Sequence, residues 1–214
     1  YGRQGNPTTA ALEAKVSAME GGVATVSFAT GMAAIGAIML TLTRAGDHVV
    51  ASRYLFGNTA SLFQTLEAHG GDVTFVDATD AAAVEAAVTP RTRLVFVETI
   101  ANPRTQVADL AGIGEVCARH GLVYVVDNTM TSPWLFRPST VGASLVVNAL
   151  TKYIGGHGNA LGGSVTDTGL FDWTRYPAIH DAYKGANPKL WAVTQIRKKG
   201  LRDWGGTLAA SDAH

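Results

Sequence analysis

Lys152 is the first residue in this chain whose type and position suggest chemistry. It follows an apolar run, residues 145–147, that is typical of a short buried strand, and glycines follow at 155, 156, 158, 162 and 163. A lysine is costly to bury unless it is paired or used in a reaction. We therefore expect Lys152 to carry a Schiff base. A surface lysine at a strand end is the alternative that this position alone leaves open.

Residues 30–32, Thr-Gly-Met, lie at an expected turn from a strand into a helix. Backbone N–H groups at a helix N-terminus, with a hydroxyl beside them, suit a phosphate group, and Gly31 allows a close approach. An ordinary helix N-cap at Thr30 is the simpler alternative.

Asp127 ends a run of five apolar residues, so its carboxylate is expected deep in the fold, where its charge needs a partner. A protonated pyridine nitrogen is one candidate and a metal ion is another. A helix cap or a buried hydrogen-bond acceptor would be a purely structural role. Phe56, beside a glycine, could stack on a planar ring or belong to the core.

The order of these features is more specific than any one of them. A phosphate-type turn comes first, an acid at a later strand end follows, and a lysine comes about 25 residues after the acid, which matches a pyridoxal-phosphate enzyme. The sequence has no CxxC, HExxH or G-x-S-x-G motif. A Rossmann-type nucleotide binder using glycines 155–163 is disfavoured, because no G-x-G-x-x-G follows the first expected strand with an acid about 20 residues on.

The composition is that of a globular protein with a sizeable core. Of 214 residues, 47% are hydrophobic and 16% charged, and the formal net charge is zero. Zero net charge argues against a nucleic-acid or anionic-membrane surface. No apolar run reaches the roughly 18 residues that a membrane span needs. The single cysteine, Cys117, excludes an intrachain disulfide, and we expect a reduced, cytoplasmic setting.

Strands and helices are expected to alternate along most of the chain. Nearly all-apolar strands of this kind predict an α/β three-layer sandwich with a mainly parallel sheet of about seven strands. Strands are expected at 23–28, 48–52, 73–77, 93–99, 122–126, 145–148 and 163–166. Helices are expected at 7–20, 30–42, 59–69, 80–88, 109–120 and 188–201.

In open α/β sheets, ligands bind outside the carboxyl ends of the strands. The loops expected there carry residues 30–32, 56–58, Glu98 with Asn102, 127–128 and 151–152. We expect an N-terminal arm at 1–7, a cofactor-binding large domain at 8–202, and at 203–214 the start of a link to a further C-terminal domain. The sequence is thus expected to be a piece of a longer protein.

Several motifs together resemble the Cys/Met-metabolism family of pyridoxal-phosphate enzymes, of fold type I. The motifs are Asn6-Pro-Thr, Thr30-Gly-Met-Ala-Ala-Ile35, Glu98-Thr-Ile-Ala-Asn-Pro103, Val125-Val-Asp-Asn-Thr129 and Leu150-Thr-Lys-Tyr-Ile-Gly-Gly-His157. The family includes cystathionine γ-synthase, cystathionine and methionine γ-lyases, and O-acetylhomoserine sulfhydrylase. Leu55-Phe-Gly-Asn-Thr59 and Asn148-Ala-Leu-Thr-Lys152 are most similar to the homoserine-ester sulfhydrylase branch.

The resemblance implies a role for each matching residue. Lys152 would form the Schiff base with pyridoxal 5'-phosphate and shuttle protons, and Asp127 would pair with the pyridinium nitrogen. The resemblance assigns the phosphate group to Gly31, Met32 and Thr151, the ring face to Phe56 and the ring hydroxyl to Asn102. Tyr1 and Arg3 would reach the phosphate of a neighbouring subunit. Thr30, whose hydroxyl lies beside the turn at Gly31, is also expected to bind the cofactor. A homo-oligomer with shared sites, a dimer of dimers, is implied.

Two positions depart from the family pattern. The ring-stacking position is commonly a tyrosine, whose hydroxyl can help proton transfer, but here it is Phe56. The residue three before the lysine is commonly a phosphate-binding serine, but here it is Ala149, which removes one hydrogen bond worth about 1 kcal/mol. We expect weaker cofactor retention as a result. The family's substrate-carboxylate arginine belongs to the C-terminal domain.

The expected function is γ-replacement on an O-acylhomoserine by a thiol or sulfide, in methionine or cysteine synthesis. A γ-elimination lyase and a cystathionine γ-synthase are the alternatives within the family. A catalytically incomplete fragment that only binds the cofactor is a further alternative.

Overall fold

The structure is a computed structural model, and it describes residues 5–203 of the chain. Tyr1 and Arg3 lie outside the described residues, so their implied contacts stay predictions. The described strands are β1 (Ala24–Phe28), β2 (His48–Ser52), β3 (Asp72–Val76), β4 (Thr92–Glu98), β5 (Val123–Asp127), β6 (Leu145–Asn148) and β7 (Gly163–Asp167). They form one sheet in the order β1-β7-β6-β5-β4-β2-β3. The predicted α/β fold with a mainly parallel sheet is confirmed.

The direction of the strands decides which loops meet. Strands β2 to β6 are parallel to one another. Strand β7 is antiparallel to both β6 and β1, so β1 points the same way as the five parallel strands. The loops after β1, β2, β4, β5 and β6 therefore leave from one edge of the sheet, where ligands bind in folds of this kind.

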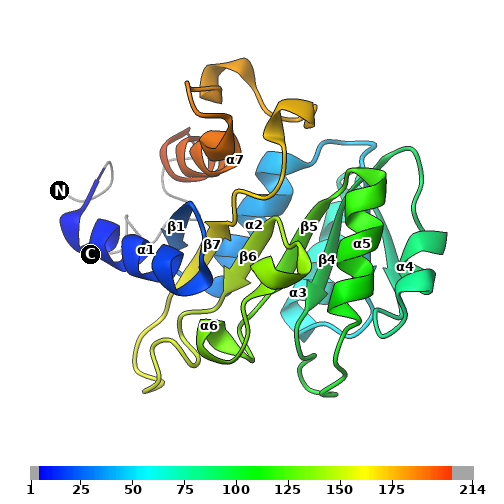
Figure 1. Cartoon of the computed structure of the whole chain (residues 1–214), viewed down its shortest axis with the longest axis horizontal. Helices are drawn as coiled ribbons and strands as arrows, with labels where there is room; N and C mark the ends of the chain where they lie inside the picture. The colour runs from blue at the N-terminus through cyan, green and yellow to red at the C-terminus, as the bar shows by residue number, and fades with distance from the viewer. Residues whose placement is uncertain (1–4, 204–214) are drawn as a thin grey trace.

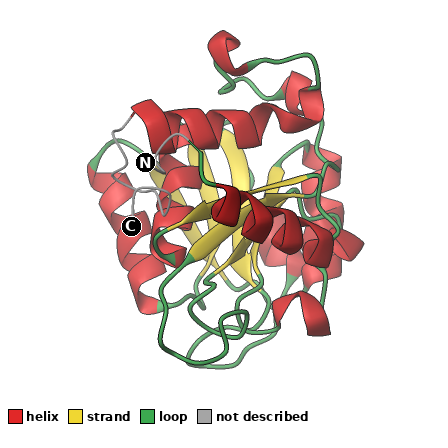
Figure 2. Cartoon of the chain, turned by 90° about the vertical axis from the view of Figure 1, so that its left-hand side faces the viewer, coloured by secondary structure: helices red, strands yellow, loops and turns green. Residues whose placement is uncertain are grey.

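Helices cover both faces of the sheet, as Figures 1 and 2 show. On one face, α2 (Gly31–Leu42), α3 (Gly57–Ala68) and α7 (Trp191–Gln195) contribute to a core that includes Ile38, Phe63 and Val193. On the other face, α4 (Ala81–Ala86) and α5 (Leu110–His120) contribute Val84 and Ile113 to a second core. Successive strand residues alternate between the two cores, because side chains on a strand point to opposite faces. The sheet and the helices on its two faces are the three predicted layers.

Capping residues begin and end α1 and begin α2 close to the bounds expected from the sequence. Asn6 accepts hydrogen bonds from the backbone of Thr8 and Thr9 at the start of α1 (Pro7–Glu20), and Gly21, with φ of 70°, ends it. Thr30 Oγ1 accepts from Ala33 N at 3.0 Å and starts α2. Left-handed glycine at a helix end costs little, because glycine has no Cβ.

The C-terminal helix differs from the prediction of one continuous helix over 188–201. The structure has a 3-10 turn (Pro188–Leu190), then α7, then a π-helical segment (Ile196–Asp203). Apolar spacing over so short a stretch does not distinguish the i→i+4 bonds of an α-helix from i→i+5 bonds. A four-residue helix, α6 (Ser132–Leu135), also forms where no element was expected.

Candidate active site

The loops at the carboxyl edge of the sheet enclose a cavity of about 670 Å³. Every predicted site residue within the described part of the chain lines it. These residues are Thr30, Gly31, Met32, Phe56, Asn102, Asp127, Thr151 and Lys152. They come from loops that span more than 120 positions of the sequence, and only the parallel strand order brings them to one place.

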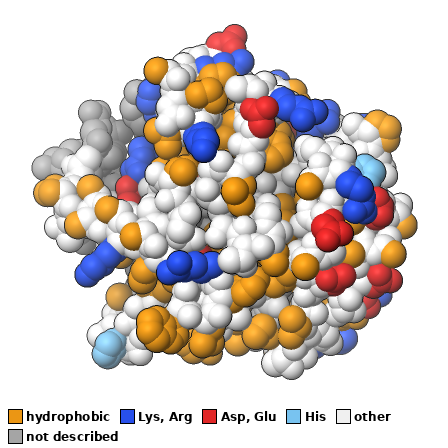
Figure 3. All heavy atoms as spheres, in the orientation of Figure 1, with side chains coloured by type: hydrophobic (Ala, Val, Ile, Leu, Met, Phe, Trp, Pro, Cys, Tyr) orange, Lys and Arg blue, Asp and Glu red, His pale blue; other side chains and the backbone are white. Residues whose placement is uncertain are grey.

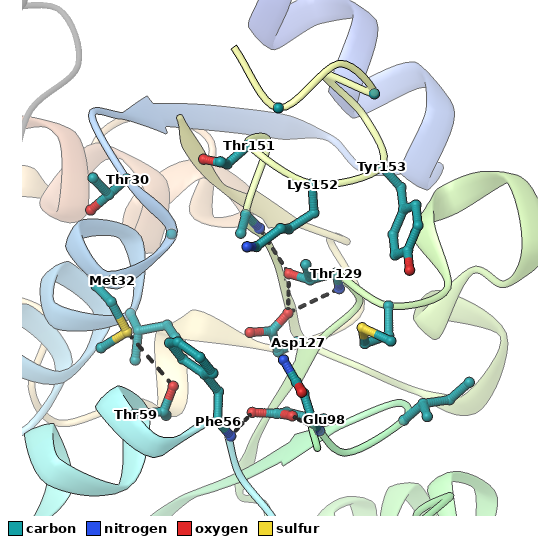
Figure 4. A pocket seen from close by; sticks show the side chains of 18 residues that line it. Thr30, Met32, Phe56, Thr59, Glu98, Asp127, Thr129, Thr151, Lys152 and Tyr153 are labelled. Carbon is teal, nitrogen blue, oxygen red and sulfur yellow. Dashed lines mark hydrogen bonds between the residues drawn. The ribbon is translucent and has the colours of Figure 1, made fainter. Parts of the chain in front are cut away.

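Lys152 and Asp127 point into the same space (Figure 4). The Lys152 side chain is exposed to the open cavity, so the expectation of a buried lysine is wrong. The reason is that β6 ends at Asn148 and the chain then turns along the cavity wall. Within the described residues, Lys152 Nζ makes no hydrogen bond or ion pair. An unpaired amine facing a cavity is available for reaction with a ligand.

The glycines after Lys152 make a tight turn possible. The backbone N–H of Gly155 donates to Leu150 O at 2.8 Å, and a Cβ at Gly155 would lie 2.7 Å from that oxygen. Gly156 and Gly158 have φ of 75° and 65°, values that side chains disfavour. These glycines shape the turn beside Lys152, and Gly156 and Gly158 also line the cavity.

Thr129 orients Asp127, a role that was not predicted from the sequence. Asp127 Oδ1 accepts hydrogen bonds from Thr129 N at 2.9 Å and from Thr129 Oγ1 at 2.5 Å. The same hydroxyl accepts the backbone N–H of Ala149 at 2.8 Å. Burial raises the pKa of Asp127, and the Thr129 bonds offset part of that rise. The Asp-x-Thr spacing, which favours a side-chain turn, was the available sequence signal.

Glu98 is a second carboxylate in the cavity wall, level with Asp127 in the β4–β5 register. Its Oε1 accepts the backbone N–H of Phe56 at 2.6 Å, and its Oε2 accepts that of Asn102 at 3.2 Å. Burial raises the pKa of Glu98 to about 7, and the nearby Asp127 adds to the rise. Glu98 thus fixes two loops that face the cavity.

Phe56 lies at the cavity wall with 41% of its surface exposed, so its ring is not part of the core.

Thr151 was expected to bind the phosphate group, but its hydroxyl is bonded to the backbone of Gly162, at 3.1 Å to the N–H and 3.3 Å to the oxygen. At the start of α2, a Cβ on Gly31 would lie 2.7 Å from Ala149 Cβ. Glycine is therefore required at 31 for the β6 loop to pack against this helix end.

The residues fit pyridoxal phosphate. The raised pKa of Asp127 reflects a buried carboxylate with hydrogen bonds but no cationic partner among the described residues, and a pyridinium nitrogen would supply one. The free N–H groups at the start of α2 suit a phosphate. Within residues 5–203, no group of three His, Cys, Asp or Glu side chains is placed to hold a metal ion.

Comparison with known proteins agrees with this geometry. Residues 1–214 match the profile of the family described as Cys/Met metabolism PLP-dependent enzyme. The chain belongs to this family. Pyridoxal phosphate is therefore its cofactor, and the family resemblance seen in the sequence motifs is confirmed. Which of its residues hold the cofactor stays a prediction that the cavity supports.

Relatives within the family carry out more than one reaction. The chain is 44% identical to an O-acetyl-L-homoserine sulfhydrylase of Corynebacterium glutamicum, over 100% of this chain and 52% of that protein. It is 42% identical to an L-methionine gamma-lyase of Pseudomonas putida, over 85% of this chain and 46% of that protein. The solved structure of an O-acetylhomoserine sulfhydrylase of Wolinella succinogenes superposes with a TM-score of 0.86 at 40% identity, covering 95% of this chain and 59% of that one.

The chain spans about half the length of the curated relatives it matches. In the part of the chain that the structure describes, no helix combines the length and apolar character needed to cross a membrane.

Proposed function

We propose that this chain is the cofactor-binding part of an enzyme that performs γ-replacement on an O-acylhomoserine, with a thiol or sulfide as the second substrate. The observation that carries the proposal is the placement of Lys152, Asp127, Phe56 and the α2 N-terminus around one cavity. The similarity to O-acetylhomoserine sulfhydrylases supports the choice of reaction.

Each residue has a task in this proposal. Pyridoxal phosphate, when bound, supplies an electron-withdrawing ring that stabilises negative charge at the substrate carbons. Lys152 Nζ would hold the cofactor covalently, and once freed by the substrate amine it would take the proton from the substrate Cα. Asp127 would hold a proton on the pyridine nitrogen. The N–H groups of Gly31 and Met32 would bind the phosphate, and Phe56 would stack on the ring.

Proton transfer in this site falls mainly to Lys152. Phe56 has no hydroxyl, and the other titratable side chains lining the described cavity are Asp127, Glu98 and Tyr153. Asp127 and Glu98 are held by hydrogen bonds to Thr129, Phe56 and Asn102. Lys152 is the one among these four with a flexible, unpaired basic group.

The absorbance spectrum of the purified protein with pyridoxal phosphate tests the site. We expect a band from lysine-bound cofactor in the wild type and in Lys189→Ala, a matched control at an exposed lysine. Lys152→Ala should lose that band. An unchanged band in Lys152→Ala would show that another residue holds the cofactor.

The reaction is tested by assaying the full-length protein with O-acetylhomoserine and sulfide. Formation of homocysteine and acetate is the expected result. No homocysteine, together with ammonia and 2-oxobutyrate from methionine, would instead establish the γ-elimination reaction of a lyase. Cofactor binding without either reaction would identify a protein that only binds the cofactor.

We also propose that the protein works as a homo-oligomer, a dimer of dimers with shared sites. Large apolar side chains lie exposed on the cavity edge of the molecule, with Trp134 91% and Leu135 74% exposed on α6. Tyr153 and Leu161 flank the turn after β6 and are also exposed. Figure 3 shows hydrophobic side chains gathered along the lower edge of the molecule, where Figure 1 places α6. Exposed apolar patches of this kind favour a protein partner.

The cytoplasmic location expected from the sequence stays a prediction.

A further inference from the structure

Glu20, the last residue of α1, is a buried carboxylate that the proposed mechanism does not use. It is 0% exposed, and no ion pair reaches it within the described residues. Burial raises its pKa, and hydrogen bonds from Asn148 and Asn128 and the charge of Arg137 offset part of that rise. A buried carboxylate without a paired cation is unfavourable unless its hydrogen bonds compensate. The segments that these hydrogen bonds join therefore indicate what Glu20 does in the fold.

Glu20 joins the ends of the two strands that carry the reactive residues. Asn148 Nδ2 donates to Glu20 Oε1 at 2.7 Å, and Asn128 Nδ2 donates to the same oxygen at 3.1 Å. Asn128 directly follows Asp127, and Asn148 is the last residue of β6, four positions before Lys152. One carboxylate oxygen thus lies between the chain segments that present Asp127 and Lys152.

The sheet itself does not hold these segments together past the strand ends. The β5–β6 pairing ends at Asp127 and Val147, with one more backbone bond from Asn128 N to Val147 O at 2.8 Å. Beyond this bond, side chains must set the distance between the segments that follow β5 and β6. Asn148 Oδ1 is buried and accepts no hydrogen bond within the described structure, so the bond to Glu20 is what orients this amide.

We propose that Glu20 is a positioning residue: its carboxylate clamps Asn128 and Asn148, and thereby sets Asp127 and Lys152 at the spacing one bound cofactor requires. The inference rests on the cofactor site proposed above. Glu20 does not line the cavity, so it acts through the two asparagines. Removing the acceptor would leave the buried Asn148 amide without its hydrogen-bond partner, while Asn128 Nδ2 would keep its bond to Phe136 O at 2.9 Å.

Glu13 on the same helix provides a matched control. It is also a buried glutamate, but it accepts from Ser27 N at 2.8 Å and pairs with Arg197. None of these residues lines the cavity. Glu13→Gln should therefore lower the melting temperature and leave cofactor affinity unchanged, which separates loss of packing by α1 from loss of the clamp.

An exchange of donor and acceptor tests the clamp directly. Asn148→Asp places two carboxylates side by side, and we expect the dissociation constant for pyridoxal phosphate to rise about tenfold or more. Combining it with Glu20→Gln restores a complementary pair, because the new amide nitrogen donates to the new carboxylate. The amide oxygen then takes the place of Oε2, which lies 3.5 Å from Asn128 Nδ2, and can still accept from Asn128. The double variant should return to within about threefold of the wild type.

The readouts are the dissociation constant and the lysine-bound absorbance band of the full-length protein, with melting temperature measured alongside. Asn148→Ala serves where Asn148→Asp does not fold, and should also bind the cofactor more weakly. A double variant no tighter than Asn148→Asp, or wild-type affinity in Asn148→Ala, would overturn the clamp. A wild-type protein without the lysine-bound band would instead overturn the cofactor site, and the inference with it.

Discussion

At the scale of single residues, a few short side chains decide what the larger ones can do. Thr129 has one hydroxyl proton, which it gives to Asp127, and its oxygen lone pairs receive the N–H of Ala149. Thr129 therefore connects Asp127, the residue expected to face the pyridine nitrogen, with the loop that carries Lys152. Ala149 in turn packs against Gly31 at the start of α2.

Removing the Thr129 hydroxyl should loosen both connections. In Thr129→Val, the Ala149 N–H loses its acceptor and Asp127 keeps only the backbone bond from residue 129. We expect the free energy of unfolding to fall by about 1–3 kcal/mol and pyridoxal phosphate to bind more weakly. Urea unfolding and cofactor titration measure the two effects. Thr129→Ser keeps the hydroxyl, so its unfolding free energy and cofactor affinity should match those of the wild type. If Thr129→Val has the same stability and affinity as Thr129→Ser, the hydroxyl does not have the proposed role.

Adding a hydroxyl at Ala149 should strengthen the site. Its Cβ faces the start of α2, where the phosphate group is expected, so Ala149→Ser adds a donor in reach of a charged acceptor. We expect the dissociation constant for pyridoxal phosphate to fall about three- to tenfold. Ala118→Ser, on the exposed face of α5, is the control. Equal affinities in the two variants would show that the phosphate lies elsewhere.

At the scale of elements, the cavity depends on how strand ends are connected to the loops beside them. Glu98 ends β4 and holds the backbone of Phe56, before α3, and of Asn102 in its own loop. Glu20 ends α1 and holds the segments after β5 and β6. Both connections use buried carboxylates, which bond strongly to N–H groups but are unfavourable when charged.

The charge on Glu98 predicts a pH dependence of stability. Its pKa is about 7 in the fold and 4.5 in an ordinary setting, so the folded state binds this proton more tightly. Its contribution to stability is full below about pH 4.5 and is lost as the pH rises through about 7, a change of at most about 3 kcal/mol. Glu98→Gln removes this pH-dependent contribution to stability, because a glutamine side chain does not titrate.

Denaturant unfolding of cofactor-free protein at pH 5 and pH 8 measures the effect. The difference in unfolding free energy, wild type minus Glu98→Gln, should fall as the pH rises. The pKa of Asp167 is also raised by burial, to about 7, but Asp167 is present in both proteins and cancels in this difference. A difference independent of pH would show that Glu98 titrates normally.

At the scale of the whole molecule, the exposed apolar edge beside the cavity is the feature that bears on assembly. Trp134, Leu135, Tyr153 and Leu161 come from two loops that leave the carboxyl edge of the sheet. A partner bound over this edge would adjoin the cavity, which agrees with the proposal of shared sites.

A charge on this edge should therefore weaken the proposed oligomer. We expect Trp134→Glu to shift the protein toward smaller species in sedimentation velocity at micromolar concentration. Leu170→Glu is the control, because Leu170 is 58% exposed but follows β7, whose reversed direction places it at the opposite edge of the sheet. Identical sedimentation of both variants would place the interface elsewhere.

The sequence by itself determined the seven strands, the longer helices before residue 121, their order and approximate bounds, but not α6 or the helical type after Pro188. Apolar runs, N-caps such as Asn6 and Thr30, and stop glycines act within a few positions of the chain, so they can be read locally. The order of Thr30, Asp127 and Lys152 along the chain predicted the cofactor class, because each of these residues follows an expected strand. Local patterns did not distinguish α- from π-helix after Gln195.

Only the tertiary structure decided which side chains meet. The exposure of Lys152 and Phe56 depends on the open cavity, and the turn of Thr151 toward Gly162 depends on the path of the loop. The bond between Glu20 and Asn148 joins residues 128 positions apart. Such contacts follow from how a helix packs across a sheet, which no local pattern of residues specifies.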